Sequence, residues 1–228
     1  MAKTKVKSKY VCQECGYETS GYLGKCPACG AWGSIIEEVE TKSTSNSSVT
    51  DFLNTEKPKL INEITLDDSV RVSTNISEFD RVLGGGLVQG SLVLLAGDPG
   101  IGKSTLILQT SGELCKQNKK VLYTSAEESA SQVKLRAERL GIHTDNLYIY
   151  PQTNLELIRA QIKDLKPDVL VIDSIQSIYT DNISSSAGSV SQVRECCNVL
   201  MQIAKSENIT IIVIGHVTKE GNIAGPKV

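Results

Sequence analysis

A glycine-rich segment between an apolar run and a helical pattern constrains this chain more than any other feature. Residues 97–104 read Gly-Asp-Pro-Gly-Ile-Gly-Lys-Ser, which matches G-x-x-x-x-G-K-[ST], and they directly follow the apolar run 92–96. Glycines let backbone N–H groups converge on phosphate oxygens, and the helix N-terminus adds its partial positive charge. The segment therefore predicts a nucleoside-triphosphate site where a strand meets a helix.

This loop and the first residues of its helix predict the contacts to ATP. We expect Lys103 to reach the β- and γ-phosphates and to act in catalysis, and the Ser104 hydroxyl to hold Mg²⁺. The predicted nucleotide-binding residues are Gly97, Asp98, Pro99, Gly100, Ile101, Gly102, Lys103, Ser104 and Thr105.

Apolar runs alternate with helical patterns through the rest of the chain, which is typical of an α/β protein. Strands separated by helices of this length form a mainly parallel sheet covered on both faces. Asn75 and Glu78 have the spacing of a capping box for a short preceding helix. The predicted strands are 92–96, 121–124, 147–150, 169–172 and 210–215, and the longer helices are 103–117, 129–140, 155–165 and 190–206.

Ionisable residues follow three of these strands, so they should share the carboxyl edge with the glycine-rich loop. Asp173 ends an apolar run in the manner of a Walker B element and is the second candidate for holding Mg²⁺. Glu127 or Glu128 can act as the general base, Glu127 being favoured, although acids are also common at a solvated helix start. His216 is a candidate catalytic residue that senses the γ-phosphate, or else a structural histidine.

Four cysteines near the N-terminus follow the pattern C-x2-C-x10-C-x2-C: Cys12, Cys15, Cys26 and Cys29. Two such pairs are typical of a structural zinc site with four thiolate ligands, and the missing secretion signal disfavours disulfides. The segment around them is too poor in apolar residues to fold unaided, so zinc should supply its folding energy. We expect Tyr17, Tyr22 and Trp32 to pack around the site, and Cys115, Cys196 and Cys197 to be small buried hydrophobes.

The composition divides the chain into three parts. We predict a zinc ribbon over 1–40, a linker over 41–62 that is rich in Ser, Thr, Asn and Lys, and a nucleotide-binding core over 63–228. A net charge of −2 excludes a protein that coats nucleic acid by bulk charge alone. Apolar runs are far shorter than the ~20 residues of a membrane helix, and no signal region is visible, so we expect a cytoplasmic protein without membrane partners.

The ribbon combined with these motifs resembles the RadA (Sms) family of bacterial DNA recombination and repair ATPases. The resemblance rests on 78–88 (Glu-Phe-Asp-Arg-Val-Leu-Gly-Gly-Gly-Leu-Val), the glycine-rich loop, 125–129 and 215–221. It implies a RecA-like core, DNA-stimulated ATP hydrolysis, hexameric rings around single-stranded or branched DNA, branch migration, and work beside a RecA-type recombinase. By position, Glu127 matches the family's catalytic glutamate, and the segments after Tyr179 and His216 match DNA-facing loops, of which Lys219 is the candidate DNA contact.

The resemblance also implies a sheet order and an incomplete core. The strands would run 147–150, 121–124, 169–172, 210–215 and 92–96. The family continues with further strands, a Lys-Asn-Arg-Phe-Gly motif and a protease-like C-terminal domain, none of which precedes Val228. We therefore expect a truncated chain whose last-named strand is an exposed edge.

Two other functions fit the same residues. A KaiC-like regulatory ATPase of the RecA superfamily would share the glycine-rich loop and the paired glutamates, although the ribbon argues against it. Alternatively, the chain is a module that binds nucleotide and partner without turnover. DNA-stimulated hydrolysis would distinguish these functions from the favoured one.

Overall fold

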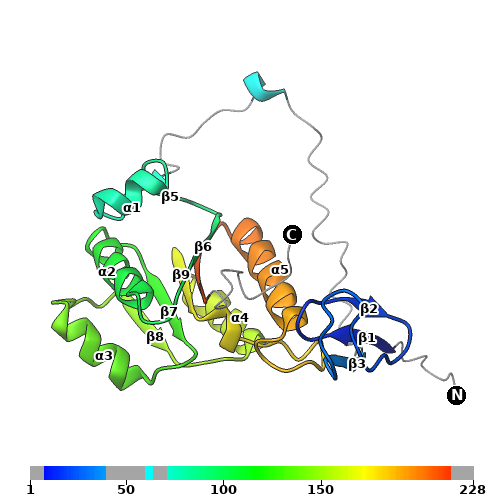
Figure 1. Ribbon diagram of the computed structural model, residues 1–228. Coiled ribbons are helices and arrows are strands. Elements are labelled where there is room, and N and C mark those ends of the chain that lie inside the picture. The colour runs from blue at the N-terminus through cyan, green and yellow to red at the C-terminus, as the bar shows by residue number, and fades with distance from the viewer. Residues whose placement is uncertain (1–7, 40–59, 64–70, 217–228) are drawn as a thin grey trace, which may run out of the picture.

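The computed structural model describes residues 8–39, 60–63 and 71–216. Lys219 and almost all of the predicted linker lie outside these ranges. The described part comprises a small antiparallel ribbon, a larger α/β core and, between them in the sequence, a single turn, η2 (Ile61–Glu63) (Figure 1). Among the described helices, none combines the length and apolar character that crossing a membrane requires.

The ribbon is a three-stranded antiparallel sheet with a very small core. Its strands are β1 (Ser8–Cys12), β2 (Glu18–Thr19) and β3 (Ile35–Val39), in the order β2-β1-β3. The buried cluster consists of Cys12, Cys26 and Ile35, with Tyr10 and Cys15 packed against it. So little apolar surface agrees with the prediction that a metal has to stabilise this part.

A five-stranded parallel sheet forms the centre of the core, in the order β6-β10-β9-β7-β8. This is the order that the family resemblance implied, so that prediction is confirmed. In the described residues β6 pairs with β10 alone, and Leu94 on it is 45% exposed, as expected of an apolar edge. The strands are β6 (Leu92–Gly97), β7 (Val121–Ser125), β8 (Leu147–Tyr150), β9 (Val169–Asp173) and β10 (Thr210–His216).

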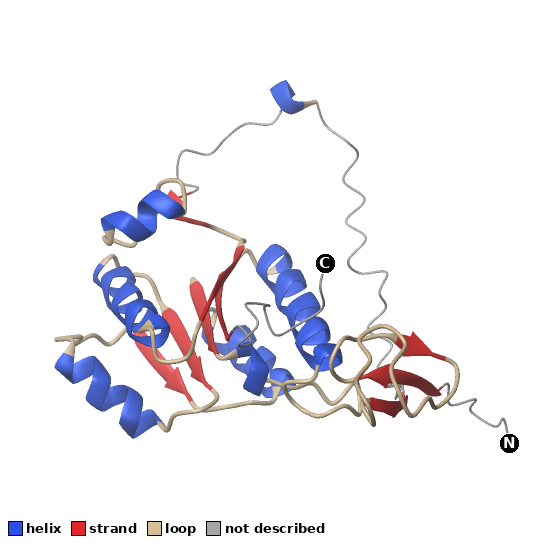
Figure 2. Ribbon diagram, viewed as in Figure 1, coloured by secondary structure: helices blue, strands red, loops and turns tan. Residues whose placement is uncertain are grey.

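Helices cover both faces of this sheet, as Figure 2 shows, which confirms the predicted α/β class. Side chains alternate between faces along a strand, so Leu170 and Ile172 of β9 join one apolar cluster and Val169 and Val171 the other. The first cluster includes α4 (Leu155–Leu165) and α5 (Val190–Ser206). The second includes α2 (Lys103–Lys116) and α3 (Ala130–Arg139).

A short helix, α1 (Ser77–Val82), lies outside the main layers between β4 (Arg71–Val72) and β5 (Leu87–Val88). The predicted capping box is wrong: Ile76 is the N-cap, and its side chain caps nothing. Asn75 has a left-handed backbone (φ 56°), so the chain enters the helix in another geometry. The Asp80 carboxylate instead accepts from the backbone N–H of Thr74 at 2.8 Å.

The cysteines outside the ribbon behave as predicted. Cys115 and Cys196 are buried, and Cys197 is partly buried against the first apolar cluster. Burial raises the pKa of the Cys196 thiol to about 12, so this thiol stays protonated and acts as a small apolar side chain.

Candidate functional site

The parallel register brings the predicted site residues to one edge of the sheet. Strand β10 pairs His216 with Gly97 on one side and Ile214 with Asp173 on the other. Ser125, two residues before Glu127, pairs with Asp173 in turn. The ends of four neighbouring strands therefore carry the glycine-rich loop, the histidine, the aspartate and the glutamates on the same side.

The glycine-rich loop connects β6 to α2 in the predicted strand-to-helix context. Gly100 and Gly102 have φ angles of 79° and 97°, a region that favours glycine, and Gly102 is the N-cap of α2. The α2 N-terminus has no side-chain cap, so its first N–H groups are open to an anion from this side. Residues 98–102 are exposed, so a phosphate chain could reach them.

Lys103 is buried to 7% exposure at the start of α2, although it carries a charge. Its Nζ donates to the carbonyl oxygens of Gly97 (2.8 Å) and Asp98 (2.7 Å). These bonds hold the ammonium under the loop. The lysine is thus placed to add a charge to the anion site that the backbone forms.

Asp173 and Ser104 offer oxygen ligands suited to Mg²⁺. Asp173 is the last residue of β9, and its Oδ2 accepts a 2.6 Å hydrogen bond from the Tyr123 hydroxyl. Tyr123 is almost fully buried in β7, and burial followed by the nearby Asp173 charge raises its pKa, so it stays a donor. The tyrosine hydroxyl therefore orients the Asp173 carboxylate. The other carboxylate oxygen, Oδ1, is the one suited to a metal.

The two adjacent glutamates have different neighbours. Glu128 pairs with the Arg136 guanidinium of α3, which directs its carboxylate to the helix. Glu127 Oε1 instead accepts hydrogen bonds from Ser174 (2.7 Å) and Ser177 (3.0 Å) beside Asp173. The Ser174 bond holds the pKa of Glu127 below its ordinary value, against the opposing effect of burial. Glu127 is thus an ionised acceptor at the strand ends, whereas Glu128 is paired with an arginine.

His216, the last residue of β10, lies beside the same carboxylate. Its Nε2 is 3.7 Å from Glu127 Oε1, and its carbonyl accepts from Gln176 Nε2 at 3.2 Å. Its Nδ1 is buried and has no hydrogen-bond partner among the described residues. The histidine is therefore close enough to interact with Glu127.

Sequence reasoning missed the side chains that orient these carboxylates. Ser174 directly follows the predicted magnesium ligand, and Tyr123 lies within a predicted strand, which are the only signals the sequence offers. Ser177 and Arg136 carry no local signal, because their contacts join segments about 50 and 8 residues apart.

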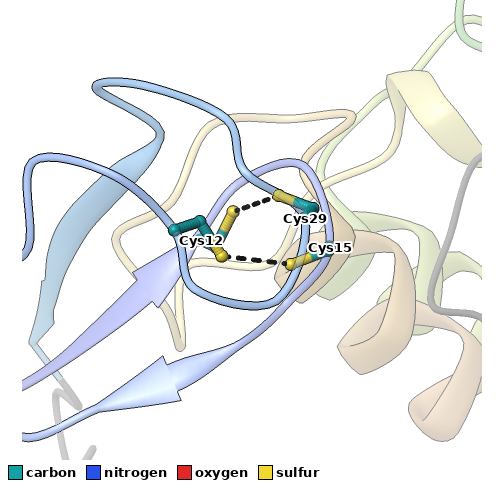
Figure 3. A group of neighbouring side chains, drawn as sticks. Cys12, Cys15 and Cys29 are labelled. Carbon is teal, nitrogen blue, oxygen red and sulfur yellow. Dashed lines mark hydrogen bonds between the residues drawn. The ribbon is translucent and has the colours of Figure 1, made fainter.

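The four ribbon cysteines converge as predicted. Their sulfur atoms all lie within 4.8 Å of one another. The Sγ–Sγ distances are 3.7 Å for Cys12–Cys29 and 3.6 Å for Cys15–Cys26. A tetrahedron of sulfurs about 2.3 Å from zinc has edges of about 3.8 Å, so the thiols fit this metal. Figure 3 shows Cys12, Cys15 and Cys29 directed toward a common centre.

Each cysteine pair is held by the same turn. The N–H of Gly16 donates to the Cys12 carbonyl (2.8 Å), and that of Gly30 to the Cys26 carbonyl (2.9 Å). Both glycines have positive φ, 72° and 77°, which a side chain would disfavour. These backbone turns therefore orient the two thiols of each pair without help from a metal.

The aromatic residues of the ribbon do not all pack around this site, so that prediction is wrong. Trp32 is 77% and Tyr22 64% exposed, and Tyr17 is 39% exposed. Tyr22 makes an edge-on contact with Tyr10, and the Lys25 ammonium lies 5.6 Å from the Trp32 ring centre. A ribbon this small has too little interior to cover three large rings.

Two family descriptions match the chain in the regions just described. An AAA domain matches residues 59–222, and a rubredoxin metal binding domain matches residues 10–37. The first covers the sheet with its glycine-rich loop, and the second covers the four cysteines. Together they support an ATP-binding core and a zinc-binding ribbon.

Curated bacterial proteins are similar over essentially the whole chain. The DNA repair protein RadA of Listeria monocytogenes is 54% identical over 227 residues, and that of Bacillus subtilis is 51% identical over 230 residues; each alignment covers 100% of this chain and 50% of the relative. The RadA of Streptococcus pyogenes is 51% identical over 98% of this chain and 49% of its own length. The resemblance to the RadA family is confirmed, and the chain spans about half the length of these relatives.

Proposed function

We propose, from the premise that this chain belongs to the AAA domain family, that it is the ATP-hydrolysing part of a bacterial DNA repair protein. One observation carries the proposal. The register of β6, β10, β9 and β7 brings the glycine-rich loop, His216, Asp173 and Glu127 to one sheet edge. A triphosphate site needs a phosphate cradle, a magnesium anchor and a base, and these residues have the chemistry for all three.

ATP would bind through the loop backbone and the start of α2. The backbone N–H groups of residues 97–105, except at Pro99, which has none, would surround the phosphates. The Lys103 ammonium would release the loop carbonyls and bind the β- and γ-phosphates instead. Ser104 would bind Mg²⁺ directly, and Asp173 through water. The metal, when bound, neutralises charge that develops on the phosphate oxygens.

Hydrolysis would use Glu127 as the general base. Its carboxylate would accept a proton from a water molecule as the water oxygen bonds to the γ-phosphorus. The bond from that phosphorus to the bridging oxygen breaks, and ADP leaves with the electron pair. His216, 3.7 Å from Glu127, would respond to the γ-phosphate at the same edge.

The wider activity is proposed from the relatives. We propose that the longer protein binds single-stranded or branched DNA, assembles as a hexamer, and drives branch migration beside a RecA-type recombinase in the cytoplasm. The segments after Tyr179 and His216 would face the DNA, with Lys219 contacting phosphate. The division into ribbon (1–40), linker (41–62) and core (63–228) is part of this proposal.

Hydrolysis measured with and without single-stranded DNA tests this function. We expect ATP turnover that DNA stimulates, and a Lys103→Ala variant that loses most ATP affinity because no neighbouring N–H group replaces its charge. The exposed Lys205→Ala on α5 is the matched control and should bind ATP normally. Normal ATP affinity in the Lys103→Ala variant would exclude the site, and turnover that ignores DNA would favour a regulatory ATPase.

The DNA contact has its own test. Single-strand affinity falls with salt by about 0.7 log unit per log unit of salt for each phosphate that a cation neutralises. Lys219→Ala should therefore reduce that slope and leave nucleotide affinity intact. A slope equal to that of the wild type would assign the DNA phosphate to another residue.

A further inference from the structure

The Glu127 carboxylate is held by one of its two oxygens. Oε1 accepts from the hydroxyls of Ser174 (2.7 Å) and Ser177 (3.0 Å), and His216 Nε2 lies 3.7 Å from the same atom. Within the described residues, no hydrogen bond or ion pair reaches Oε2. The Glu127 side chain is 54% exposed, so water has access to this carboxylate.

The two hydroxyls belong to a well-fixed turn. Ser174 is fully buried directly after β9, and Ser177 ends the single turn η3 (Ile175–Ser177). Ile175 anchors this turn in the first apolar cluster, and Gln176 Nε2 ties it to the end of β10 through the His216 carbonyl. The donors therefore have little freedom to move.

Fixing one oxygen matters because a glutamate side chain has three rotatable bonds. A general base must keep its accepting atom within hydrogen-bond reach of the attacking water. Freezing the rotation in advance removes an entropic cost from the reaction step. The arrangement leaves Oε2 at a defined place beside the sheet edge while Oε1 is occupied.

The neighbouring Glu128 shows the contrast. It is held by Arg136, a cation on α3, and not by hydroxyls on the β9 side. A cation would compete for a proton acceptor far more strongly than a hydroxyl does. Hydroxyl donors are thus suited to orient a base without removing its charge.

We infer that Ser177, together with Ser174, is a positioning residue for ATP hydrolysis, holding Oε1 of Glu127 so that Oε2 faces the attacking water. The inference rests on the proposed ATPase function. Ser177 is the more useful test position because its side chain is partly exposed, whereas Ser174 is part of the buried core.

Steady-state ATP hydrolysis by Ser177→Ala and Ser177→Thr tests the inference. Removal of one orienting hydrogen bond should lower kcat about 3- to 30-fold and leave KM for ATP within about twofold. Ser177→Thr keeps the hydroxyl and should restore most of kcat. Ser206→Ala, at an exposed serine that ends α5, is the control and should match the wild type.

Two results would overturn the inference: an unchanged or raised kcat in Ser177→Ala, or a loss that Ser177→Thr fails to restore. If the wild-type chain hydrolyses no ATP, the proposed function fails and the role of Ser177 in hydrolysis fails with it; a thermal unfolding cycle then tests only the contact between Ser177 and Glu127. In that cycle, the loss of Tm in the double variant Ser177→Ala/Glu127→Ala should be smaller by about 1–3 °C than the sum of the losses in the two single variants. Additive shifts would show that the two side chains do not interact, which also overturns the inference.

Discussion

The ribbon and the α/β core solve the problem of stability in different ways. The core buries two apolar clusters, one on each face of its sheet, whereas the buried cluster of the ribbon is Cys12, Cys26 and Ile35. Trp32 and Tyr22 remain largely exposed on the ribbon, while Tyr123 in the core is almost completely buried. From this difference we expect the ribbon to depend on its metal for folding and the core to fold without it.

Zinc removal should produce the largest difference between the two regions. Structural zinc contributes about 10–16 kcal/mol to the folding of comparable small sites, so a chelator or Cys26→Ser should unfold the ribbon entirely. The core should keep its cooperative unfolding transition. Metal analysis should find one zinc per wild-type chain and well under one in the variant. A ribbon that stays folded without zinc, or a core that unfolds together with the ribbon, would contradict this difference between the two regions.

Removing a buried apolar side chain from the core should have the reverse effect: it should destabilise the core and leave the ribbon unchanged. Leu170 is fully buried in β9, so Leu170→Ala should destabilise the core by about 2–5 kcal/mol. Leu157→Ala on α4 is the matched control because Leu157 is 49% exposed, and it should cost far less. Denaturant unfolding measures both variants, and zinc content should be unchanged in each. Equal losses of stability in the two variants would contradict the assigned core.

Substitution of one glycine in each region should have smaller effects, which differ between Gly86 in the core and Gly24 in the ribbon. At Gly86 φ is 127°, and an added Cβ would lie 2.5 Å from the Val72 carbonyl oxygen. Gly86→Ala should therefore cost about 1–3 kcal/mol of core stability. Gly24→Ala in the ribbon, where nothing lies within 4 Å, should leave zinc affinity nearly unchanged. Thermal unfolding and zinc competition measure the two effects, and a neutral Gly86→Ala would refute the packing of β4 against β5.

The ribbon and the core should respond to acid at different pH values, because different groups titrate in each. A cysteine thiol binds zinc only after it has lost its proton. Falling pH should therefore release the metal at mildly acid values. The pKa of Glu127 is lowered from 4.5, so its contribution to core stability is complete above that value and disappears only as pH falls through the lower folded value. Zinc release should precede core unfolding in a titration followed by a zinc dye and circular dichroism. Core unfolding at a higher pH than zinc release would contradict this order.

The sequence predicted those parts of the molecule that depend on short patterns. The glycine-rich loop, the four-cysteine spacing and the alternating apolar strands each depend on neighbouring residues, and the family resemblance supplied the sheet order. The capping box failed because Asn75 lies one residue before the N-cap, has a left-handed backbone, and directs its side-chain amide to Glu113 on α2, a contact that the local pattern does not reveal. Burial of the ribbon aromatics failed because pattern alone does not reveal how little interior a small sheet has.

The carboxylate neighbours could not be predicted for a different reason. Whether Glu127 or Glu128 is available depends on which segment packs beside each, and those segments are α3 and the η3 turn. Adjacent acids look equivalent in sequence. Only the fold assigns Arg136 to Glu128 and the two serine hydroxyls to Glu127.

Single-turnover ATP hydrolysis by Glu127→Gln and Glu128→Gln tests the central claim most directly. Both changes keep size and remove one carboxylate from adjacent positions, so each controls for the other. Glu127→Gln should bind ATP normally and lose about 10²–10⁴-fold in rate, as expected when a general base is removed. Glu128→Gln should hydrolyse ATP within a few-fold of the wild type. A large loss in Glu128→Gln with normal turnover in Glu127→Gln would contradict the assignment of the base.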